Sequence, residues 1–361
     1  MNARTRSARS AGLLELPVIG PLLRASLRSV FREKLGPQGA DERLARVADA
    51  IAAPRAGSTT LRPHPSVDPA RGRARLLFIL STERSGSTLF SLALGRSPRH
   101  VTPPEMHLLA YPTFEAWRED YPTAIASLQF LLHASGVDES DEAVARRFAG
   151  WKSEVIYRWI LEGRLEGEKL FIDKTPKYAR DPVTLSRIES LEPRYIWLVR
   201  HPLAVAASQI ALRRERSLAR SSGPFGFIKR PLVKLREQVN APDLLEQEVA
   251  YWLALNTHIE GFLAGIDPAR WRRVSLERFV REPEKVLREV SAWLGSEFDA
   301  AMLDPRESIP REMRPELGDP KVYRHQKIDP AVGDAWRADY TDDWLDDETR
   351  RAMARWGVPT S

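Results

Sequence analysis

The sequence predicts a layered α/β domain with a mostly parallel sheet, on the basis of three observations. Short apolar runs alternate with longer helical patterns from Arg73 onward, which is typical of strand–helix–strand units. The runs at residues 76–80 and 195–199 are continuous in hydrophobic side chains, as expected for parallel strands that are buried on both faces. The chain has 361 residues, of which 43% are hydrophobic, so it is long enough to bury a sizeable core.

The first 70 residues are predicted to form an appendage and a linker. They contain two short helix-like patterns, at residues 22–35 and 41–52, and end in a proline-rich stretch at residues 54–69. The first pattern combines apolar residues with four basic ones. It suits either a helix packed on the main domain or a helix that docks a partner protein or a membrane surface. The main domain is expected to comprise residues 71–361.

Four strands and four main helices are expected in this domain. The strands are predicted at residues 76–81, 169–172, 195–199 and 273–276. The helices are predicted at residues 182–191, 203–213, 244–263 and 284–294. Several of these helices begin at proline or acidic residues, which favour a helix start. Trp252 and Asn256 lie one turn apart on the third helix, where a core-facing stripe is the simplest interpretation.

The composition excludes several classes of chemistry. The chain has no cysteine, which rules out disulfides, cysteine nucleophiles and thiolate metal sites. Its seven histidines lack the usual zinc-binding spacings, so no metal is expected. No run approaches the ~20 apolar residues of a membrane-spanning helix, and no signal peptide is recognised, so we expect a cytoplasmic protein. The net charge of +6 suits an anionic ligand without selecting one.

A candidate anion-binding turn follows the first predicted strand. The segment Ser-Thr-Glu-Arg-Ser-Gly-Ser-Thr occupies residues 81–88 and leads into a helical run at residues 89–94. The unpaired N–H groups and the dipole at a helix start favour an anion, and the hydroxyl groups of the turn add donors. The candidate ligand-binding residues are Arg84, which supplies the full charge, Ser85, Gly86, Ser87 and Thr88. The alternative is that Ser-Gly-Ser-Thr only caps the helix.

A second candidate anion-binding element lies at the end of the third predicted strand. Residues 195–199 are followed by Arg200, His201 and Pro202, and a helix is expected to start there. Ser208 lies two turns into that helix. Because strand ends and helix starts surround one crevice in doubly wound sheets, Arg200 and Ser208 could contact the same phosphate.

The sequence was also compared with the patterns expected for two other functions. A nucleotide-dependent kinase is disfavoured, because residues 81–88 lack the Gly-x-x-x-x-Gly-Lys-Ser/Thr pattern and no later Asp is placed as a magnesium ligand. A non-enzymatic binder of nucleic acid or of a membrane surface is suggested by the basic segment at residues 213–236. Basic runs are usually solvated surfaces, so no nucleic-acid partner is expected.

The two anion-binding elements together resemble those of sulfotransferases that use 3'-phosphoadenosine-5'-phosphosulfate (PAPS). Residues 84–88, Arg-Ser-Gly-Ser-Thr, resemble the 5'-phosphosulfate loop of that family. Leu-Val-Arg-His-Pro at residues 198–202, followed by Ser208, resembles its 3'-phosphate site, including the eight-residue step from Arg200 to Ser208. The resemblance implies a P-loop-like sulfotransferase fold, PAPS as cofactor, 3'-phosphoadenosine-5'-phosphate (PAP) as product, and no metal.

Three further segments resemble one branch of the family, the sulfotransferases of bacterial polyketide pathways, including the curacin-type domains. They are Pro-Glu-Met-His-Leu-Leu at residues 104–109, Asp-Lys-Thr-Pro-Lys-Tyr at residues 173–178, and His-Gln-Lys-Ile-Asp at residues 325–329 with Trp336. This resemblance implies a hydroxyl acceptor that is small or bound to a carrier protein, such as a β-hydroxyacyl chain. A diffusible metabolite, glycan or lipid is the alternative acceptor.

The resemblance also implies roles for individual residues. Arg84 and Lys174 would stabilise the charge that develops on the leaving phosphate, by analogy with phosphoryl transfer. His325 is the preferred general base for the acceptor hydroxyl, with Glu105 orienting either His325 or the acceptor, and the opposite assignment stays open. His107 is a third candidate base, or else a packed residue of its loop.

Overall fold

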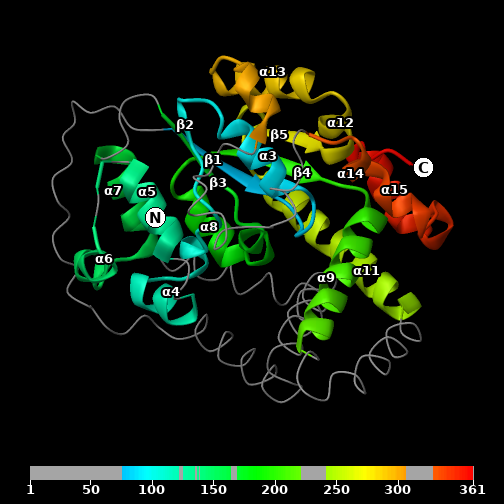
Figure 1. The fold of residues 1–361 in the computed structure, drawn as a ribbon, viewed down its shortest axis with the longest axis horizontal. Helices are drawn as coiled ribbons and strands as arrows, with labels where there is room; N and C mark the ends of the chain where they lie inside the picture. The colour runs from blue at the N-terminus through cyan, green and yellow to red at the C-terminus, as the bar shows by residue number, and fades with distance from the viewer. Residues whose placement is uncertain are drawn as a thin grey trace, which may run out of the picture. The chain divides into compact units, whose positions relative to one another are not determined.

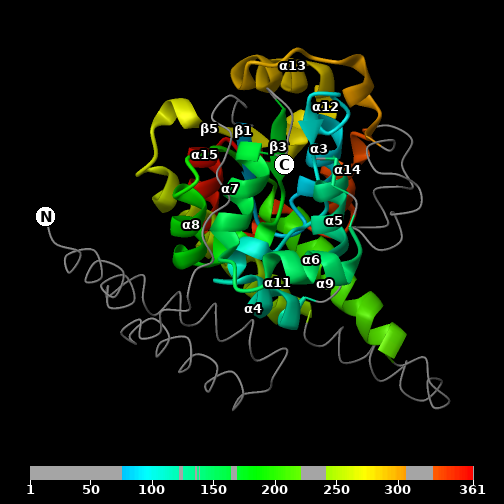
Figure 2. The ribbon, with the colours of Figure 1, turned by 90° about the vertical axis from the view of Figure 1, so that its left-hand side faces the viewer.

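The computed structural model describes residues 75–121, 125–134, 136–137, 139–163, 169–220, 241–305 and 328–360, which Figures 1 and 2 show in two views. They contain a five-stranded sheet with the strand order β2-β3-β1-β4-β5. The strands are β1 (Arg75–Leu80), β2 (His100–Val101), β3 (Leu170–Asp173), β4 (Arg194–Val199) and β5 (Trp271–Ser275). Every pair of neighbouring strands is parallel, so the predicted class of fold is confirmed.

A helix follows each of the strands β1, β3, β4 and β5 in the chain, and α4 to α7 form a further group. The described α-helices are α3 (Ser87–Leu94), α4 (Phe114–Asp120), α5 (Ile125–Ala134), α6 (Asp141–Phe148), α7 (Ser153–Gly163), α8 (Pro182–Glu189), α9 (Pro202–Arg220), α11 (Ala241–Leu263), α12 (Leu276–Arg281), α13 (Pro283–Leu294), α14 (Ala331–Asp334) and α15 (Asp347–Trp356). The 3-10 helices are η1 (Leu108–Ala110), η3 (Pro176–Arg180), η4 (Pro268–Arg270), η5 (Ala300–Leu303), η9 (Ala335–Ala338) and η10 (Asp342–Trp344). Figure 1 shows α4, α5, α6 and α7 grouped together and α9 alongside α11.

Each face of the sheet has its own hydrophobic core. Along β1, Leu76, Phe78 and Leu80 belong to one core, whereas Leu77 and Ile79 belong to the other, because successive side chains of a strand point to opposite faces. The first core includes buried residues from α4 to α11 and from α15, and the second is packed against α3, α12 and α13. Burial on both faces is the physical reason why these strands are continuous in apolar residues.

The predicted strands are confirmed with differences at their ends. Leu276, predicted to end the last strand, is instead the first residue of α12, because the Ser275 side chain accepts the N–H of Arg278 and caps a helix there. Strand β2 was not anticipated, since two residues are too few to give a pattern. Trp252 and Asn256 are fully buried, as the core-facing interpretation predicts. The predicted appendage at residues 1–70 lies outside the described residues, so its boundary stays a prediction.

Candidate active site

The candidate site lies at the carboxyl ends of three adjacent strands. Strand β1 pairs with β3 on one side and with β4 on the other. The segments that follow parallel strands meet at one edge of the sheet, where open α/β folds bind ligands. Here those segments are the turn at residues 81–88, the residue Lys174 and the residue Arg200. The strand order therefore brings together three motifs that are far apart in the sequence.

The turn after β1 is a tight, packed structure. Arg84 has a φ of 66° and Gly86 a φ of 79°, both in the left-handed region. A Cβ on Gly86 would lie 2.5 Å from Leu276 Cδ1, so only glycine fits between this turn and α12. The hydroxyl groups of Thr82 and Ser85 are 2.6 Å apart and buried. The N–H groups of such a turn at a helix start form a concave anion site.

Arg84, Arg200 and Ser208 are neighbours in the structure. Arg84 Nε donates a hydrogen bond to Ser208 Oγ at 2.9 Å, and Arg200 Nη1 donates to the carbonyl oxygen of Arg84 at 2.8 Å. Arg200 Nη2 donates to the carbonyl oxygen of Val332, on α14, at 2.7 Å. The two candidate anion-binding elements predicted from the sequence are thus in contact, and Arg84 connects them.

The surroundings of Arg200 fit a bound anion. Burial lowers the pKa of Arg200, Glu277 opposes that effect and Arg84 adds to it, which gives a pKa of about 10. Arg200 is only 9% exposed, and its Nε is buried without a hydrogen-bond partner among the described residues, as is Ser81 Oγ. A phosphate would accept hydrogen bonds from these donors and balance two adjacent guanidinium groups. The residues present therefore suit a phosphorylated cofactor.

Buried side chains from two other elements fix the turn at Arg200. Glu277, on α12, accepts the N–H of His201 at 2.8 Å. Trp252, on α11, donates its Nε1–H to the carbonyl oxygen of Arg200 at 2.9 Å. Neither contact was predicted, because Glu277 and Trp252 are distant from Arg200 in the sequence and gave only helical patterns. They hold the guanidinium group at a defined place, which a phosphate site requires.

Lys174 connects the turn after β1 with the loop that contains Glu105. Its Nζ donates to Thr88 Oγ1 at 2.9 Å and to Glu105 Oε1 at 2.7 Å. The Lys174 side chain is 3% exposed, whereas that of Glu105 is 35% exposed. The ammonium group is therefore enclosed between the two segments, and the carboxylate remains accessible.

Glu105 is ionised throughout the physiological pH range. Burial alone would raise the pKa of Glu105, but the charges and hydrogen bonds of Lys174 and His107 lower it to about 2. The Nε2 atom of His107 lies 3.3 Å from Glu105 Oε2. The carboxylate can accept a hydrogen bond from a hydroxyl group, but a carboxylate with so low a pKa is a weak general base.

Two residues next to Lys174 hold the Glu105 loop on the end of β3. Thr175 Oγ1 accepts the N–H of Met106 at 3.1 Å and donates to Asp173 Oδ1 at 2.8 Å. Asp173 is fully buried and also accepts a hydrogen bond from Tyr157. In this segment a role was predicted from the sequence only for Lys174. The polar residues on either side of it, at the end of an apolar strand, were the available signal for Asp173 and Thr175.

His325, the preferred base, lies outside the described residues, so its role stays a prediction.

Among the residues that the structure describes, no three His, Asp or Glu side chains are gathered as a metal site would require. Likewise, none of the described helices combines the length and the hydropathy needed to cross a membrane.

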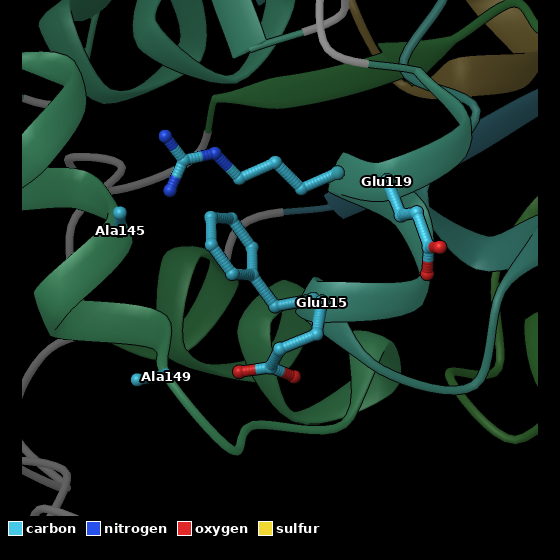
Figure 3. A pocket seen from close by; sticks show the side chains of 6 residues that line it. Glu115, Glu119, Ala145 and Ala149 are labelled. Atoms are coloured by element: carbon cyan, nitrogen blue, oxygen red, sulfur yellow. The ribbon is translucent and has the colours of Figure 1, made fainter.

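The pocket drawn in Figure 3 is separate from these residues. It lies between α4 and α6, with Glu115 and Glu119 on one side and Ala145 and Ala149 on the other. Its lining consists of Phe114, Glu115, Arg118, Glu119, Ala145 and Ala149. None of these residues belongs to the candidate site, so the pocket is not part of that site.

Comparison with known proteins identifies the family. The sulfotransferase family matches residues 77–300, which is more than half of the chain. This region includes Arg84, Glu105, Lys174, Arg200 and Ser208. The chain therefore belongs to the sulfotransferase family.

Two solved domains and one curated protein are similar to the chain. The sulfotransferase domain of the Synechococcus PCC 7002 olefin synthase is 28% identical, with a TM-score of 0.64, over 82% of this chain and 99% of that domain. The sulfotransferase domain from the curacin biosynthetic pathway is 25% identical, with a TM-score of 0.62, over 80% of this chain and all of that domain. The predicted resemblance to this branch is confirmed.

The curated relative is the nodulation protein NoeE of Sinorhizobium fredii. It is 27% identical in an alignment of 284 residues that covers 74% of this chain and 61% of NoeE. The chain thus spans about three fifths of the length of that relative.

Proposed function

We propose that this protein transfers a sulfuryl group from PAPS to a hydroxyl of a small or carrier-bound acceptor, with a β-hydroxyacyl chain as the candidate. The observation that supports this most strongly is the bridge made by Lys174. Its Nζ lies 2.9 Å from Thr88 Oγ1 in the candidate 5'-phosphosulfate turn and 2.7 Å from Glu105 Oε1. In an in-line transfer the leaving and attacking oxygens flank one sulfur atom, so a cation between the donor and acceptor sides suits the reaction.

On the donor side, the residues are arranged to hold two phosphates. The turn at residues 84–88 would bind the 5'-phosphosulfate, and Arg200 with Ser208 would bind the 3'-phosphate. Bound PAPS would supply a sulfuryl group already activated by its bond to a phosphate. Arg84 and Lys174 would stabilise the negative charge that grows on that phosphate as its oxygen–sulfur bond breaks.

On the acceptor side, Glu105 would orient the hydroxyl group that attacks the sulfur. The new oxygen–sulfur bond forms as the bond to the phosphate breaks, and the hydroxyl proton passes to a base. Because the pKa of Glu105 is about 2, we assign the proton transfer to His325 and the orientation of the acceptor to Glu105.

The proposal of a carrier-bound acceptor is supported by the two solved relatives. One of those domains is part of an olefin synthase and the other belongs to the curacin biosynthetic pathway. Competition for PAPS between a β-hydroxyacyl carrier protein and the corresponding free hydroxy acid tests this part. Faster sulfation of the free acid would contradict it.

Calorimetric titration with PAP, using ADP and AMP as controls without the 3'-phosphate, tests the cofactor. We expect micromolar or tighter binding of PAP, and much weaker binding of ADP and AMP, because Arg200 and Ser208 would meet the 3'-phosphate. Equal binding of PAP and ADP would contradict the assignment of those two residues. No binding at all would contradict the proposed cofactor.

A further inference from the structure

His107 has a backbone conformation that residues with side chains rarely adopt. Its φ is 54°, in the left-handed region, where strain is often found at functional sites. His107 precedes η1, but its side chain makes no capping hydrogen bond, so capping does not explain the conformation. The backbone is held from β3 instead, since Thr175 Oγ1 lies 3.5 Å from the N atom of His107 and binds the preceding N–H.

Glu105 contacts one edge of the His107 ring, and Tyr121 packs on one of its faces. Its Nε2 lies 3.3 Å from Glu105 Oε2, and the side chain is 15% exposed. The ring stacks on Tyr121, with centroids 4.4 Å apart and planes at 17°. Tyr121 is itself held by Lys177, whose Nζ lies 4.6 Å from the Tyr121 ring centroid. These contacts leave the imidazole a single orientation.

The surroundings determine which ring nitrogen bears the proton. Nδ1 of His107 is buried and has no hydrogen-bond partner within the described part of the chain. An N–H there would lose the hydrogen bond that it makes in water. The Glu105 carboxylate faces Nε2 and can only accept a hydrogen bond, so Nε2 bears a proton and donates a hydrogen bond to Glu105. The remaining lone pair, on Nδ1, is enclosed and out of reach of an acceptor hydroxyl, which argues against His107 as the base.

Glu105 thus has one donor on each oxygen. Lys174 donates to Oε1 at 2.7 Å, and His107 faces Oε2. A carboxylate rotates easily about its terminal torsion, so without His107 both oxygens could turn toward the ammonium of Lys174. That rotation would withdraw Oε2 from the acceptor side and strengthen the hold of Glu105 on Lys174.

We propose that His107 is a positioning residue for sulfuryl transfer: its Nε2–H fixes the Glu105 carboxylate so that Oε1 stays on Lys174 and Oε2 receives the acceptor hydroxyl. This inference rests on the proposed function and is independent of which residue is the base. His107 acts through Glu105 and does not touch the cofactor. Its removal should therefore lower turnover and leave the affinity for PAP unchanged.

The test compares two substitutions, each of which keeps a different property of His107. His107→Phe keeps an aromatic ring on Tyr121 but has no donor, whereas His107→Gln keeps an N–H donor. We expect His107→Phe to lower kcat about 100-fold, as a misplacement of about 1 Å can do, with the Kd for PAP within about threefold. His107→Gln should recover about tenfold of that loss. The readouts are PAP calorimetry and PAPS conversion with a β-hydroxyacyl-N-acetylcysteamine thioester, or with water alone, as acceptor.

A double-mutant cycle tests whether His107 acts through Glu105. In a Glu105→Gln background, His107→Phe should cause little further loss of kcat. Full activity of His107→Phe, equal losses in both His107 variants, or an additive loss in the Glu105→Gln background would each overturn the inference. So would a lower melting temperature or weaker PAP binding, because these indicate a structural role. Failure of the unaltered protein to bind PAP would instead reject the proposed function, and this inference with it.

Discussion

At the scale of single residues, hydrogen bonds fix the positions of the cations in the candidate site. Arg84 Nε donates to a hydroxyl group, and Arg200 donates to two backbone carbonyl oxygens. Such hydrogen bonds orient a guanidinium group. Lys174 is paired with the carboxylate of Glu105. These arrangements suit a site that binds phosphate at one end and positions a neutral hydroxyl at the other.

The substitution Arg84→Ala tests the charge of the turn after β1. We expect it to weaken PAP binding about 10- to 100-fold, because a hydrogen bond to a charged group contributes about 1.5–3 kcal/mol. PAPS turnover should be abolished while the protein stays folded. Calorimetry and circular dichroism measure the two properties. Arg288→Ala is a matched control, since Arg288 is exposed and pairs with Glu284 within α13. Unchanged PAP binding and turnover in a folded Arg84→Ala protein would refute the assignment of this turn.

At the scale of elements, the conformation of the turn between β1 and α3 depends on its packing against α12. Gly86 has a positive φ and lies where a side chain would overlap Leu276. Leu276 begins α12, so the position of this helix limits the space available to the turn. The backbone of the candidate phosphate site is therefore shaped by a contact between segments that are far apart in sequence.

The substitution Gly86→Ala measures this constraint. A positive φ costs an alanine about 1–2 kcal/mol, and the overlap with Leu276 adds about 1–3 kcal/mol. Gly136→Ala is the control, because Gly136 has a φ of 73° and no described atom beyond its chain neighbours lies within 4 Å of the added Cβ. Gly136→Ala therefore loses stability only through the positive φ. Urea denaturation should therefore show a larger loss for Gly86→Ala, accompanied by weaker PAP binding. Equal losses of stability at the two positions would show that packing on Leu276 is unimportant.

At the scale of the whole molecule, stability depends on pH through buried groups that act in opposite directions. His201 stacks on Trp336 with ring centroids 4.0 Å apart, and its Nε2 lies 3.1 Å from Asp342 Oδ1. Burial, only partly opposed by Asp342, lowers the pKa of His201 from 6.5 to about 4. Burial raises the pKa of Asp173 from 3.8 to about 6, despite its hydrogen bonds to Tyr157 and other residues.

We predict that removing His201 and removing Asp173 change the pH dependence of the free energy of unfolding in opposite directions. Between pH 6.5 and about 4 the unfolded state protonates His201 first, so His201 causes stability to fall as the pH falls, by roughly 3 kcal/mol in total. Asp173 keeps its proton in the folded state up to about pH 6, so it causes stability to fall as the pH rises, by a similar amount, roughly 3 kcal/mol. Relative to the unaltered protein, His201→Gln should therefore lose, and Asp173→Asn should gain, stability as the pH rises from 4 to 6.

Urea denaturation at a series of pH values measures both differences. The comparison with the unaltered protein cancels the contributions of other carboxyl groups, provided that the substitutions do not couple to them. If the stability difference between variant and unaltered protein changed with pH in the same direction for both variants, the pKa shifts assigned to His201 and Asp173 would be contradicted.

The predicted appendage is tested by deleting residues 1–70. We expect unchanged folding and unchanged PAP binding, because the first strand of the sheet, β1, begins at Arg75. Solubility, melting temperature and PAP affinity of the shortened protein are the measurements. An insoluble product would show that the deleted residues belong to the folded domain.

Much of the fold could be predicted because its signals are local. Strands β1 and β4 are buried on both faces, so each is a continuous apolar run that stands out in the sequence. The turn at residues 81–88 and the segment from Arg200 to Ser208 were recognisable for a similar reason, since the residues of each anion-binding element are close together in the chain. Helices α4 to α7 and strand β2 were not predicted. Strand β2 has only two residues and gives no pattern, whereas α6 and α7 are amphipathic and were overlooked.

The sequence by itself determined the class of fold, the two anion-binding elements and the family, because each depends on periodicity or spacing within a short segment. Only the tertiary structure decided which of these elements meet. The order β3-β1-β4 places Lys174 beside Thr88 and Glu105, and packing on Tyr121 sets the ring of His107 against the same carboxylate. Contacts between residues distant in the chain leave no periodic pattern, since they arise only when the sheet and its two cores assemble.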